Sequence, residues 1–387
     1  MEQNTLEEKK FLIIDGNSIM NRAFYGIKLL TTKDGMHTNA IYGFLNILYM
    51  MQEKISPEYI AVTFDLSAPT FRHKMYTEYK ATRHKMPDEL RMQMPVIKDI
   101  LRAMNIKILE IEGYEADDIL GTVAKFNDSK CIDEKKVHTY ILTGDRDSFQ
   151  LISDNTTIVM PSSKPGKTEY TYYDKYKLYE KYGITPQQVI DVKALMGDTA
   201  DNIPGVPGIG EKTAYPLIIN NNTLEELYSN IDNLGLTPKM YEKLTLNKEM
   251  ATLSKALATI NTEVPISLNY SEFSVKEPCI PELIKLFTRL EFKKLIDKYN
   301  VTGSAETATN EHENKIQDKV KKTNFVDLSK NMELLDNVTN SSQISFIYFT
   351  EKEPSFKMHL NELNGIFAYT LDNQTNVYYI KDTDIRI

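Results

Sequence analysis

Four short apolar segments in the first 145 residues are each followed within a few positions by an acidic side chain, and this repeat limits the folds open to the chain. The segments are residues 11–15, 59–65, 107–111 and 138–142. Residues 39–54 and 87–105, which lie between them, have the spacing of amphipathic helices. Such alternation of strand and helix predicts an α/β fold with a doubly wound, mostly parallel sheet and helices on both faces.

The acids at the ends of these segments predict a binding site. Ligands of parallel α/β sheets bind beyond the carboxyl ends of the strands, so we expect Asp15, Asp65, Glu115 and Asp145 to converge in one crevice. Five further carboxylates lie close to these in the sequence or follow in a later acidic motif: Asp117, Asp118, Asp147, Asp198 and Asp201. A single Asp at a strand end is more often a helix cap or a solvated residue, and it is the joint pattern that indicates a site.

The chemistry of this acidic set points to divalent cations. Packing many like charges together is unfavourable unless a counter-charge is present. Oxygen ligands without His or Cys indicate Mg²⁺, with Mn²⁺ as a substitute, rather than zinc. Two such ions about 4 Å apart activate a water and stabilise the leaving oxygen in phosphodiester hydrolysis. The sequence therefore predicts a two-metal phosphodiesterase.

Residues 71–86 form a basic segment with interleaved aromatic side chains directly after the second apolar segment. Arg72, Tyr79, Lys80 and Arg83 belong to it, and such a combination can bind phosphates and stack on bases. Arg22 and Tyr25, just after the first segment, are placed to join it. The alternative is a solvated basic helix face, which we consider the weaker interpretation beside an acidic crevice.

A Gly/Pro-rich turn at residues 203–210 lies between segments with helical spacing in the range 175–300. The sequence IPGVPGIGEKTA at 203–214 is similar to a helix-hairpin-helix, in which backbone N–H groups at a helix start bind a DNA phosphate without reading sequence. The residues expected to contact DNA there are Gly205, Gly208, Gly210, Lys212 and Thr213. A plain helix–helix turn is the alternative, but it rarely needs so many Gly and Pro residues.

Together these motifs resemble the 5′→3′ exonuclease (flap endonuclease) domain of bacterial DNA polymerase I over about residues 10–300. The matching segments are FLIIDGNSIMNRAFY, VTFDLSAPTFRHKMYTEYKATR, GYEADDIL, ILTGDRDSFQL and GDTADNIPGVPGIGEKTA. The resemblance implies a 5′ nuclease (PIN-like) core, a helical arch and two-metal hydrolysis of DNA or RNA primer at 5′ ends and flaps. It also implies catalytic roles at the scissile phosphate for Arg22, Lys80 and Arg83.

The resemblance further implies a division of the carboxylates between two ions. Asp15, Asp65, Glu115 and Asp117 would surround the first. Asp118, Asp145, Asp147, Asp198 and Asp201 would hold the second, some of them through water. One departure from the family pattern is Pro216, inside the helix after the hairpin, where an interior proline removes a hydrogen bond and kinks the helix.

Composition shifts suggest four parts. We expect a catalytic core with its arch (about 70–100) over residues 1–174, a helical DNA-binding region over 175–300, a polar linker over 301–324 and a strand-containing tail over 325–387. The tail resembles the start of the 3′→5′ exonuclease-like (RNase H-like) domain of the same polymerases. Its strand SFIYFTE at 345–351 lacks the Asp-x-Glu pair of an active one, so we expect the tail to be inert. The chain carries no polymerase motif.

Other features narrow the partners and the location. No stretch of about 18 apolar residues occurs, the N-terminal residues do not form a signal peptide, and the two cysteines fit no metal or redox spacing. These features predict a protein of the reducing cytosol. The family resemblance further implies a monomer in the bacterial cytoplasm, associated with the nucleoid, that binds flapped, nicked or branched DNA, or RNA primer on DNA. The net charge of −8 is a weak argument against nucleic acid, because a local basic patch matters more.

Two rival functions remain open from the residues. A non-catalytic DNA-binding module would require the loss of key acids, and none is missing. A ribonuclease of the PIN type would share the sheet, but that class lacks the helix-hairpin-helix and usually has fewer acids. Cleavage of branched DNA compared with single-stranded RNA separates the two enzymes.

Overall fold

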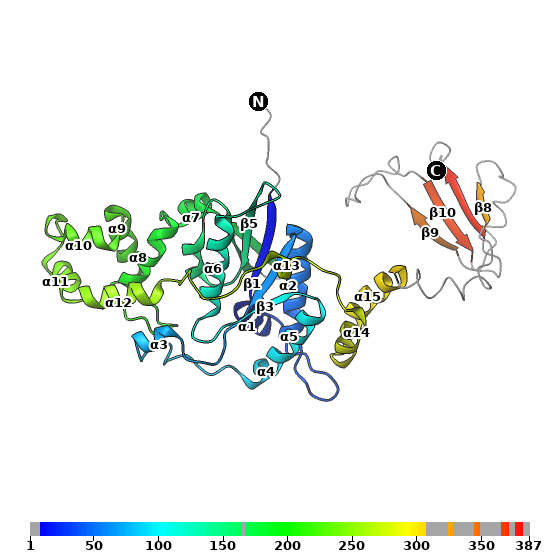
Figure 1. The fold of residues 1–387 in the computed structure, drawn as a ribbon, viewed down its shortest axis with the longest axis horizontal. Helices are drawn as coiled ribbons and strands as arrows, with labels where there is room; N and C mark the ends of the chain where they lie inside the picture. The colour runs from blue at the N-terminus through cyan, green and yellow to red at the C-terminus, as the bar shows by residue number, and fades with distance from the viewer. Residues whose placement is uncertain are drawn as a thin grey trace, which may run out of the picture. The chain divides into compact units, whose positions relative to one another are not determined.

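The computed structural model describes residues 8–164 and 167–306 and four strands within 324–381. The chain divides into two compact units, Met1–Tyr299 and Asn300–Ile387, which are described here one at a time (Figure 1). Within the described residues, no helix is long and apolar enough to cross a membrane.

The first unit is built on a mostly parallel sheet, as predicted. Its strands are β1 (Lys9–Asp15), β2 (Tyr59–Thr63), β3 (Lys107–Leu109), β4 (Cys131–Ile132), β5 (Lys135–Leu142), β6 (Thr156–Lys164) and β7 (Lys167–Tyr173). The order is β3-β2-β1-β5-β6-β7, with β4 beside β5. Strands β3, β2, β1, β5 and β6 pair in parallel, whereas β7 and β4 are antiparallel to their neighbours. The strand order reverses at β1, where β2 and β5 flank it, and such a reversal opens a crevice at the strand ends.

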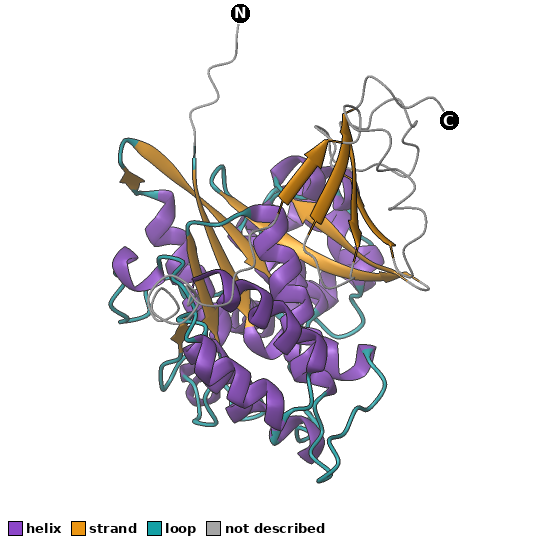
Figure 2. Ribbon diagram, turned by 90° about the vertical axis from the view of Figure 1, so that its right-hand side faces the viewer, coloured by secondary structure: helices purple, strands orange, loops and turns teal. Residues whose placement is uncertain are grey.

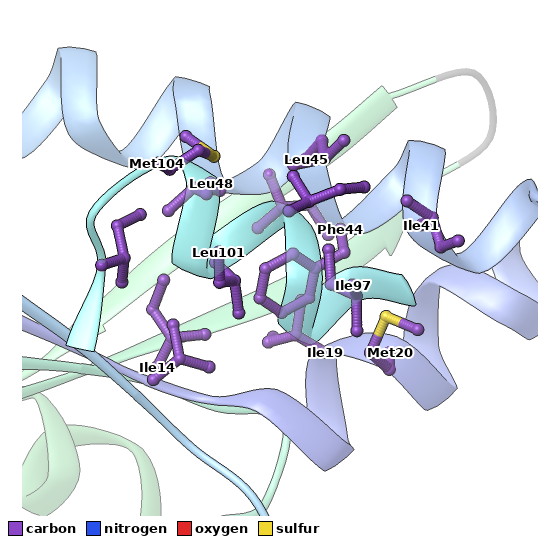
Figure 3. Close-up of a cluster of buried hydrophobic side chains, with 14 of the residues drawn as sticks. Ile14, Ile19, Met20, Ile41, Phe44, Leu45, Leu48, Ile97, Leu101 and Met104 are labelled. Atoms are coloured by element: carbon purple, nitrogen blue, oxygen red, sulfur yellow. The ribbon is translucent and has the colours of Figure 1, made fainter. Parts of the chain in front are cut away.

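Helices cover both faces of this sheet because alternate residues of β1 are apolar on both sides (Figure 2). Leu12 and Ile14 pack in one core with α1 (Gly16–Gly26), α2 (Asn39–Ile55) and α5 (Gln93–Ala103). Phe11 and Ile13 pack in the other core with α6 (Ala116–Asp128). Figure 3 shows Ile14 facing side chains of α1, α2 and α5 in the first of these cores.

The turn from β1 into α1 depends on a close backbone approach. A Cβ at Gly16 would lie 2.4 Å from the Phe64 ring and 2.6 Å from the Thr63 carbonyl oxygen. Only glycine lets α1 begin this close to the end of β2. As a result, the carboxyl ends of β1 and β2 are held next to each other.

The region expected as a helical arch, about residues 70–100, contains less helix than predicted. The basic segment holds one short helix, α3 (Phe71–Met75), and turns and extended chain lead from it to a second short helix, α4 (Asp88–Arg91). A further helix, α5, starts at Gln93 after a break at Met92.

Beyond the sheet the first unit is helical, in agreement with the sequence pattern. The elements are η1 (Arg146–Leu151), α7 (Lys175–Tyr182), α8 (Pro186–Met196), α9 (Glu211–Asn221), α10 (Leu224–Ser229), η2 (Ile231–Asn233), α11 (Pro238–Leu246), α12 (Lys248–Ala258), α13 (Tyr270–Phe273), α14 (Ile280–Arg289) and α15 (Lys293–Glu306). Helices α11 and α12 are separate and meet at Asn247. Helix α9 continues through Pro216, and α15 extends into the range expected as linker.

The second unit contains β8 (Asn324–Asp327), β9 (Ile344–Tyr348), β10 (Gly365–Thr370) and β11 (Asn376–Lys381), in the order β8-β11-β10-β9. The tail thus contains strands, as predicted, and β9 overlaps the strand predicted at 345–351. Most of the remaining tail and the linker beyond residue 306 lie outside the described residues.

Candidate functional site

A cavity of about 410 Å³ lies at the carboxyl ends of β1 and β2 and the start of α6. Its lining includes five of the nine predicted carboxylates, which are Asp15, Asp65, Glu115, Asp117 and Asp145. Lys80 and Arg83 of the basic segment line the same cavity. The four acids that were expected to converge from separate strands therefore line the same cavity as two basic side chains of the basic segment.

Backbone and hydroxyl donors fix the orientation of three of these carboxylates. Asp15 caps α1, because Oδ1 accepts from the Ser18 N–H at 2.9 Å, while Oδ2 accepts from the Thr143 hydroxyl at 2.8 Å. Asp65 Oδ1 accepts from the Ala116 N–H at 2.8 Å, at the start of α6. Asp145 caps η1 by accepting from a backbone N–H. The bonds that begin helices thus also position the acids of the cavity.

The cavity strongly disfavours further negative charge. Burial raises the pKa of Asp15 to about 7, against the hydrogen bonds from Ser18 and Thr143. Burial, Asp15, Asp145 and Asp65 together raise the pKa of Asp117 well above its ordinary value. Carboxylates that repel one another in a buried space need a cationic counter-charge.

The cavity suits a hard divalent cation, because its acidic side chains offer carboxylate oxygens as ligands. Among the residues that the structure describes, no three Asp, Glu, His or Cys side chains already group as a metal centre. Lys80 Nζ lies 2.6 Å from Glu115 Oε1, so the Lys80 side chain neutralises one of the five carboxylates.

Asp118 is placed differently from the cavity acids. It is fully buried and makes a bidentate ion pair with Arg72, with both N···O distances 2.8 Å. Arg72 is itself only 2% exposed, and it also donates to the carbonyl oxygens of Leu257 and Thr259. The pair therefore ties α3 to α6 and to the end of α12, in the interior.

Asp201 lies where the basic segment meets the loop after α8. Arg83 pairs with its carboxylate at 2.5 Å, and the Lys80 backbone N–H donates to its carbonyl oxygen at 2.9 Å. The Tyr79 hydroxyl donates to Asp201 at 3.2 Å and to Glu115 at 3.1 Å, and its side chain is 3% exposed. Tyr79 and Arg72, both expected to contact DNA, are thus buried contacts between the basic segment and the acids.

Asp147 and Asp198 share a cation that sequence reasoning missed. Lys193 Nζ donates to Asp147 at 2.6 Å and also to Asp198. Burial raises the pKa of Asp147 to about 7, and the neighbouring Asp145 adds to the shift. The pKa of Asp198 is lowered, because bonds from Lys193 and backbone N–H groups outweigh its burial. Nothing in the local sequence marks Lys193 except its place one turn before the acidic motif.

The predicted hairpin is a tight turn with an open outer side. Gly205 has φ +62°, and a Cβ there would lie 2.3 Å from the Gly197 nitrogen. Gly210 caps α9, and no atom lies within 4 Å of the position of its Cβ. Gly208 receives a hydrogen bond on its carbonyl oxygen from Lys243 Nζ at 3.2 Å, a second cation that the sequence did not reveal.

The remaining predicted residues lie on the surface near these elements. Lys212 is exposed and Thr213 half-buried in the first turn of α9. Arg22 is half-buried on α1, and Tyr25, on the same helix, is 73% exposed.

Comparison with known proteins gives two family models that match within the first unit and a relative that aligns with nearly the whole chain. A family model described as "5'-3' exonuclease, N-terminal resolvase-like domain" matches residues 10–183, and one described as "5'-3' exonuclease, C-terminal SAM fold" matches residues 184–280. DNA polymerase I of Bacillus subtilis is 37% identical over 374 residues, which is 97% of this chain and 40% of that protein.

Solved structures show the same fold. The bacteriophage T5 D15 protein co-crystallised with metal ions superposes with a TM-score of 0.52 at 21% identity, over 75% of this chain and 99% of the phage protein. The D15 flap endonuclease in a pseudo-enzyme–product complex with DNA and metal ions gives a TM-score of 0.50 at 21% identity, with the same coverage. The chain spans less than half of the length of the bacterial polymerase that it matches.

Proposed function

Residues 10–280 belong to the 5′-3′ exonuclease family, and on that basis we propose that the chain hydrolyses phosphodiester bonds of DNA at 5′ ends and flaps. The observation that carries the proposal is the cavity in which Asp15, Asp65, Glu115, Asp117 and Asp145 meet Lys80 and Arg83. A cluster of this many carboxylates can hold divalent metal ions, and the basic side chains beside it can bind the phosphate that is cleaved.

We propose Mg²⁺ as the physiological ion, with Mn²⁺ as a substitute. Asp15, Asp65, Glu115 and Asp117 would hold one ion, and Asp145, with Asp147, Asp198 and Asp201 beyond it, would hold a second. When bound, such ions supply a reactive water at neutral pH and stabilise charge on the leaving oxygen. The buried ion pair with Arg72 supports a structural task for Asp118 in place of the ligand role that the family resemblance implies.

The cations of the basic segment would act on the substrate. Lys80 and Arg83 are held at the cavity by carboxylates in the free protein, and a phosphate entering the cavity offers them an alternative anionic partner. We expect them to stabilise the developing charge on that phosphate, with Arg22 contributing from α1. Lys80→Ala should accordingly slow cleavage more than it weakens DNA binding. A pure loss of affinity would make Lys80 a tether.

The hairpin would anchor the duplex at a distance from the cavity. Backbone N–H groups at Gly208, Gly210 and the start of α9 are the proposed phosphate contacts, with Lys212 and Thr213 beside them. Lys243, which reaches the carbonyl oxygen of Gly208, adds positive charge to the same turn. The open space around Gly210 supports a close approach of the DNA backbone.

The DNA polymerase I relative guides the proposals for the rest of the molecule. We propose that the partners are flapped or nicked DNA and RNA primers on DNA, and that the chain acts as a monomer on the bacterial nucleoid in the cytoplasm, as the family resemblance implies. We also propose that residues 325–387 are the start of a 3′→5′ exonuclease-like domain, on the same resemblance, and that this segment is inactive, because the sequence around β9 carries no Asp-x-Glu pair.

Cleavage of a 5′-labelled double-flap DNA tests the proposal. We expect the full chain to release the flap near the junction in Mg²⁺, and not in EDTA. Asp145→Ala should abolish cleavage while leaving DNA binding in Ca²⁺ intact. The matched control is Asp154→Ala, because Asp154 is exposed and its ion pair with Lys175 lies on the surface.

Three outcomes would contradict the proposal. Full activity of Asp145→Ala would remove the metal assignment. Salt-sensitive DNA binding by the wild-type chain without cleavage of any branched substrate would favour a non-catalytic DNA-binding module. Cleavage of single-stranded RNA in preference to flap DNA would favour a ribonuclease.

A further inference from the structure

Lys193 lies between Asp147 and Asp198, which we call the outer acids of the site, and it joins two separate segments of the chain. Its ammonium group bonds to Asp147, which belongs to η1, and to Asp198, which follows α8. The Lys193 side chain is 13% exposed, and each of the two carboxylate side chains is 20% exposed. A cation that bridges two carboxylates in such a sheltered place does what a metal ion would do between the same oxygens.

The charge of this lysine is secured by its partners. Its ammonium nitrogen lies within hydrogen-bond distance of both carboxylates, each from a different segment. It reduces the net negative charge that the outer acids offer to any other cation.

The backbone around Lys193 is fixed, whereas its side chain is long and rotatable. The Lys193 carbonyl oxygen accepts from the N–H of Gly197, which ends α8, and Asp198 and Ile203 exchange two backbone bonds of 2.8 Å. A cavity of about 130 Å³ adjoins Lys193 and has mostly apolar walls, among them Tyr182 and Tyr215. Glu211 also lines this cavity, so the side chain can turn toward a space that offers its ammonium group another carboxylate, without a change in the backbone.

We propose that Lys193 is a built-in counter-ion that occupies the place of the second divalent ion, so that this ion binds only by displacing the lysine ammonium group. The inference rests on the proposed function, since it presumes that a first ion is held by the inner acids, which are Asp15, Asp65, Glu115 and Asp117. It implies that the two ions bind in sequence, the inner one more tightly. Lys193 thereby sets the divalent-ion concentration at which the complete site forms.

Titration with Mn²⁺ in the absence of DNA tests the inference, with free Mn²⁺ followed by electron paramagnetic resonance. In the wild-type chain we expect one tight and one weaker ion. Lys193→Met removes the competing charge and should tighten the weaker ion about tenfold, within the usual range of coupling between sites, while the tight ion is unchanged. Lys193→Arg keeps the charge and adds a bidentate fork, so it should bind the second ion more weakly than the wild type.

The matched control is Lys255→Met. Lys255 also bridges two carboxylates, Asp191 and Glu225, at 2.7 Å each, but away from the cavity acids. This variant should leave both Mn²⁺ affinities as in the wild type, which separates a local competition from a general effect of losing a positive charge.

The outcomes of the Mn²⁺ titration distinguish a failure of the counter-ion role of Lys193 from a failure of the proposed nuclease function. Unchanged or weaker second-ion binding in Lys193→Met overturns the counter-ion role, even if the chain cleaves flap DNA. A wild-type chain that binds no Mn²⁺ contradicts the proposed function instead. If circular dichroism shows that Lys193→Met does not fold, Lys193→Arg decides the matter, and second-ion binding equal to or tighter than the wild type refutes the inference.

Discussion

Arg72→Met should destabilise the first unit strongly, because the guanidinium is buried among charged partners. Arg72 makes two 2.8 Å bonds to Asp118, a 3.3 Å contact with Glu115, and bonds to the carbonyl oxygens of Leu257 and Thr259 at 2.9 and 2.7 Å. The methionine side chain fills a similar volume but satisfies none of these acceptors. The substitution therefore leaves a fully buried carboxylate without its counter-charge.

The size of the effect follows from the burial of the pair. The side chains of Arg72 and Asp118 are 3% and 0% exposed, so solvent screens the interaction little. Removing one partner of such a pair costs about 3–5 kcal/mol. At about 2–4 °C per kcal/mol for a large domain, the midpoint of thermal unfolding should fall by about 10 °C.

A double-mutant cycle distinguishes pairing from lost packing. Asp118→Leu alone should also destabilise, whereas Arg72→Met with Asp118→Leu should cost much less than the sum of the two single changes, since neither charge is then left buried alone. Arg91→Met, in the neighbouring helix α4, is the control. Its ion pair with Asp88 is exposed, so the change should stay within about 0.5 kcal/mol.

The assay combines thermal unfolding by circular dichroism in EDTA with DNA binding by fluorescence anisotropy in Ca²⁺. We expect the loss in Arg72→Met to appear in the unfolding midpoint. A variant that melts like the wild type but binds DNA many-fold more weakly would refute the reasoning, and would show that Arg72 contacts DNA as the basic segment suggested.

Two further predictions concern the hairpin and the charge of the cavity. Gly205→Ala should lower stability by more than about 1 kcal/mol, because φ is +62° and the new Cβ would meet the Gly197 nitrogen; Gly210→Ala, with open space around it, should melt like the wild type, and equal melting of both variants would contradict the turn geometry. In EDTA the unfolding midpoint should fall as pH rises from 5.5 to 8. Burial raises the pKa of Asp15 and of Asp147 to about 7 in the folded chain, whereas both carboxyl groups of the unfolded chain have lost their protons above about pH 4. The folded chain therefore binds more protons in this range and loses stability as they are released. His138, whose pKa burial lowers, acts in the opposite direction, so the specific check is that the fall shrinks in Asp15→Asn; an undiminished fall would exclude Asp15 as its source.

Local patterns in the sequence predicted the sheet and its acidic edge. The apolar strands are continuous in the sequence and each ends near a carboxylate, so their parallel order places Asp15, Asp65 and Asp145 together without further information. The hairpin was also predictable, because glycines mark the positions that need a left-handed backbone or a close approach.

The division of labour among the charged residues was not predictable from local patterns. Whether a cation of the basic segment faces DNA or a buried acid depends on partners far along the chain. Arg72 pairs with Asp118, 46 residues away, and with carbonyl oxygens nearly 190 residues away. Lys193 likewise reaches Asp147 on another element. Only tertiary packing brings such partners together.

Anomalous scattering from crystals of the full chain grown with Mn²⁺ tests the metal assignment most directly. We expect one peak among Asp15, Asp65, Glu115 and Asp117, and at higher Mn²⁺ a second peak beside Asp145, Asp147 and Asp198. A cavity without any peak, in a chain whose cleavage of flap DNA still requires the ion, would contradict the assignment of these carboxylates as the metal-binding site.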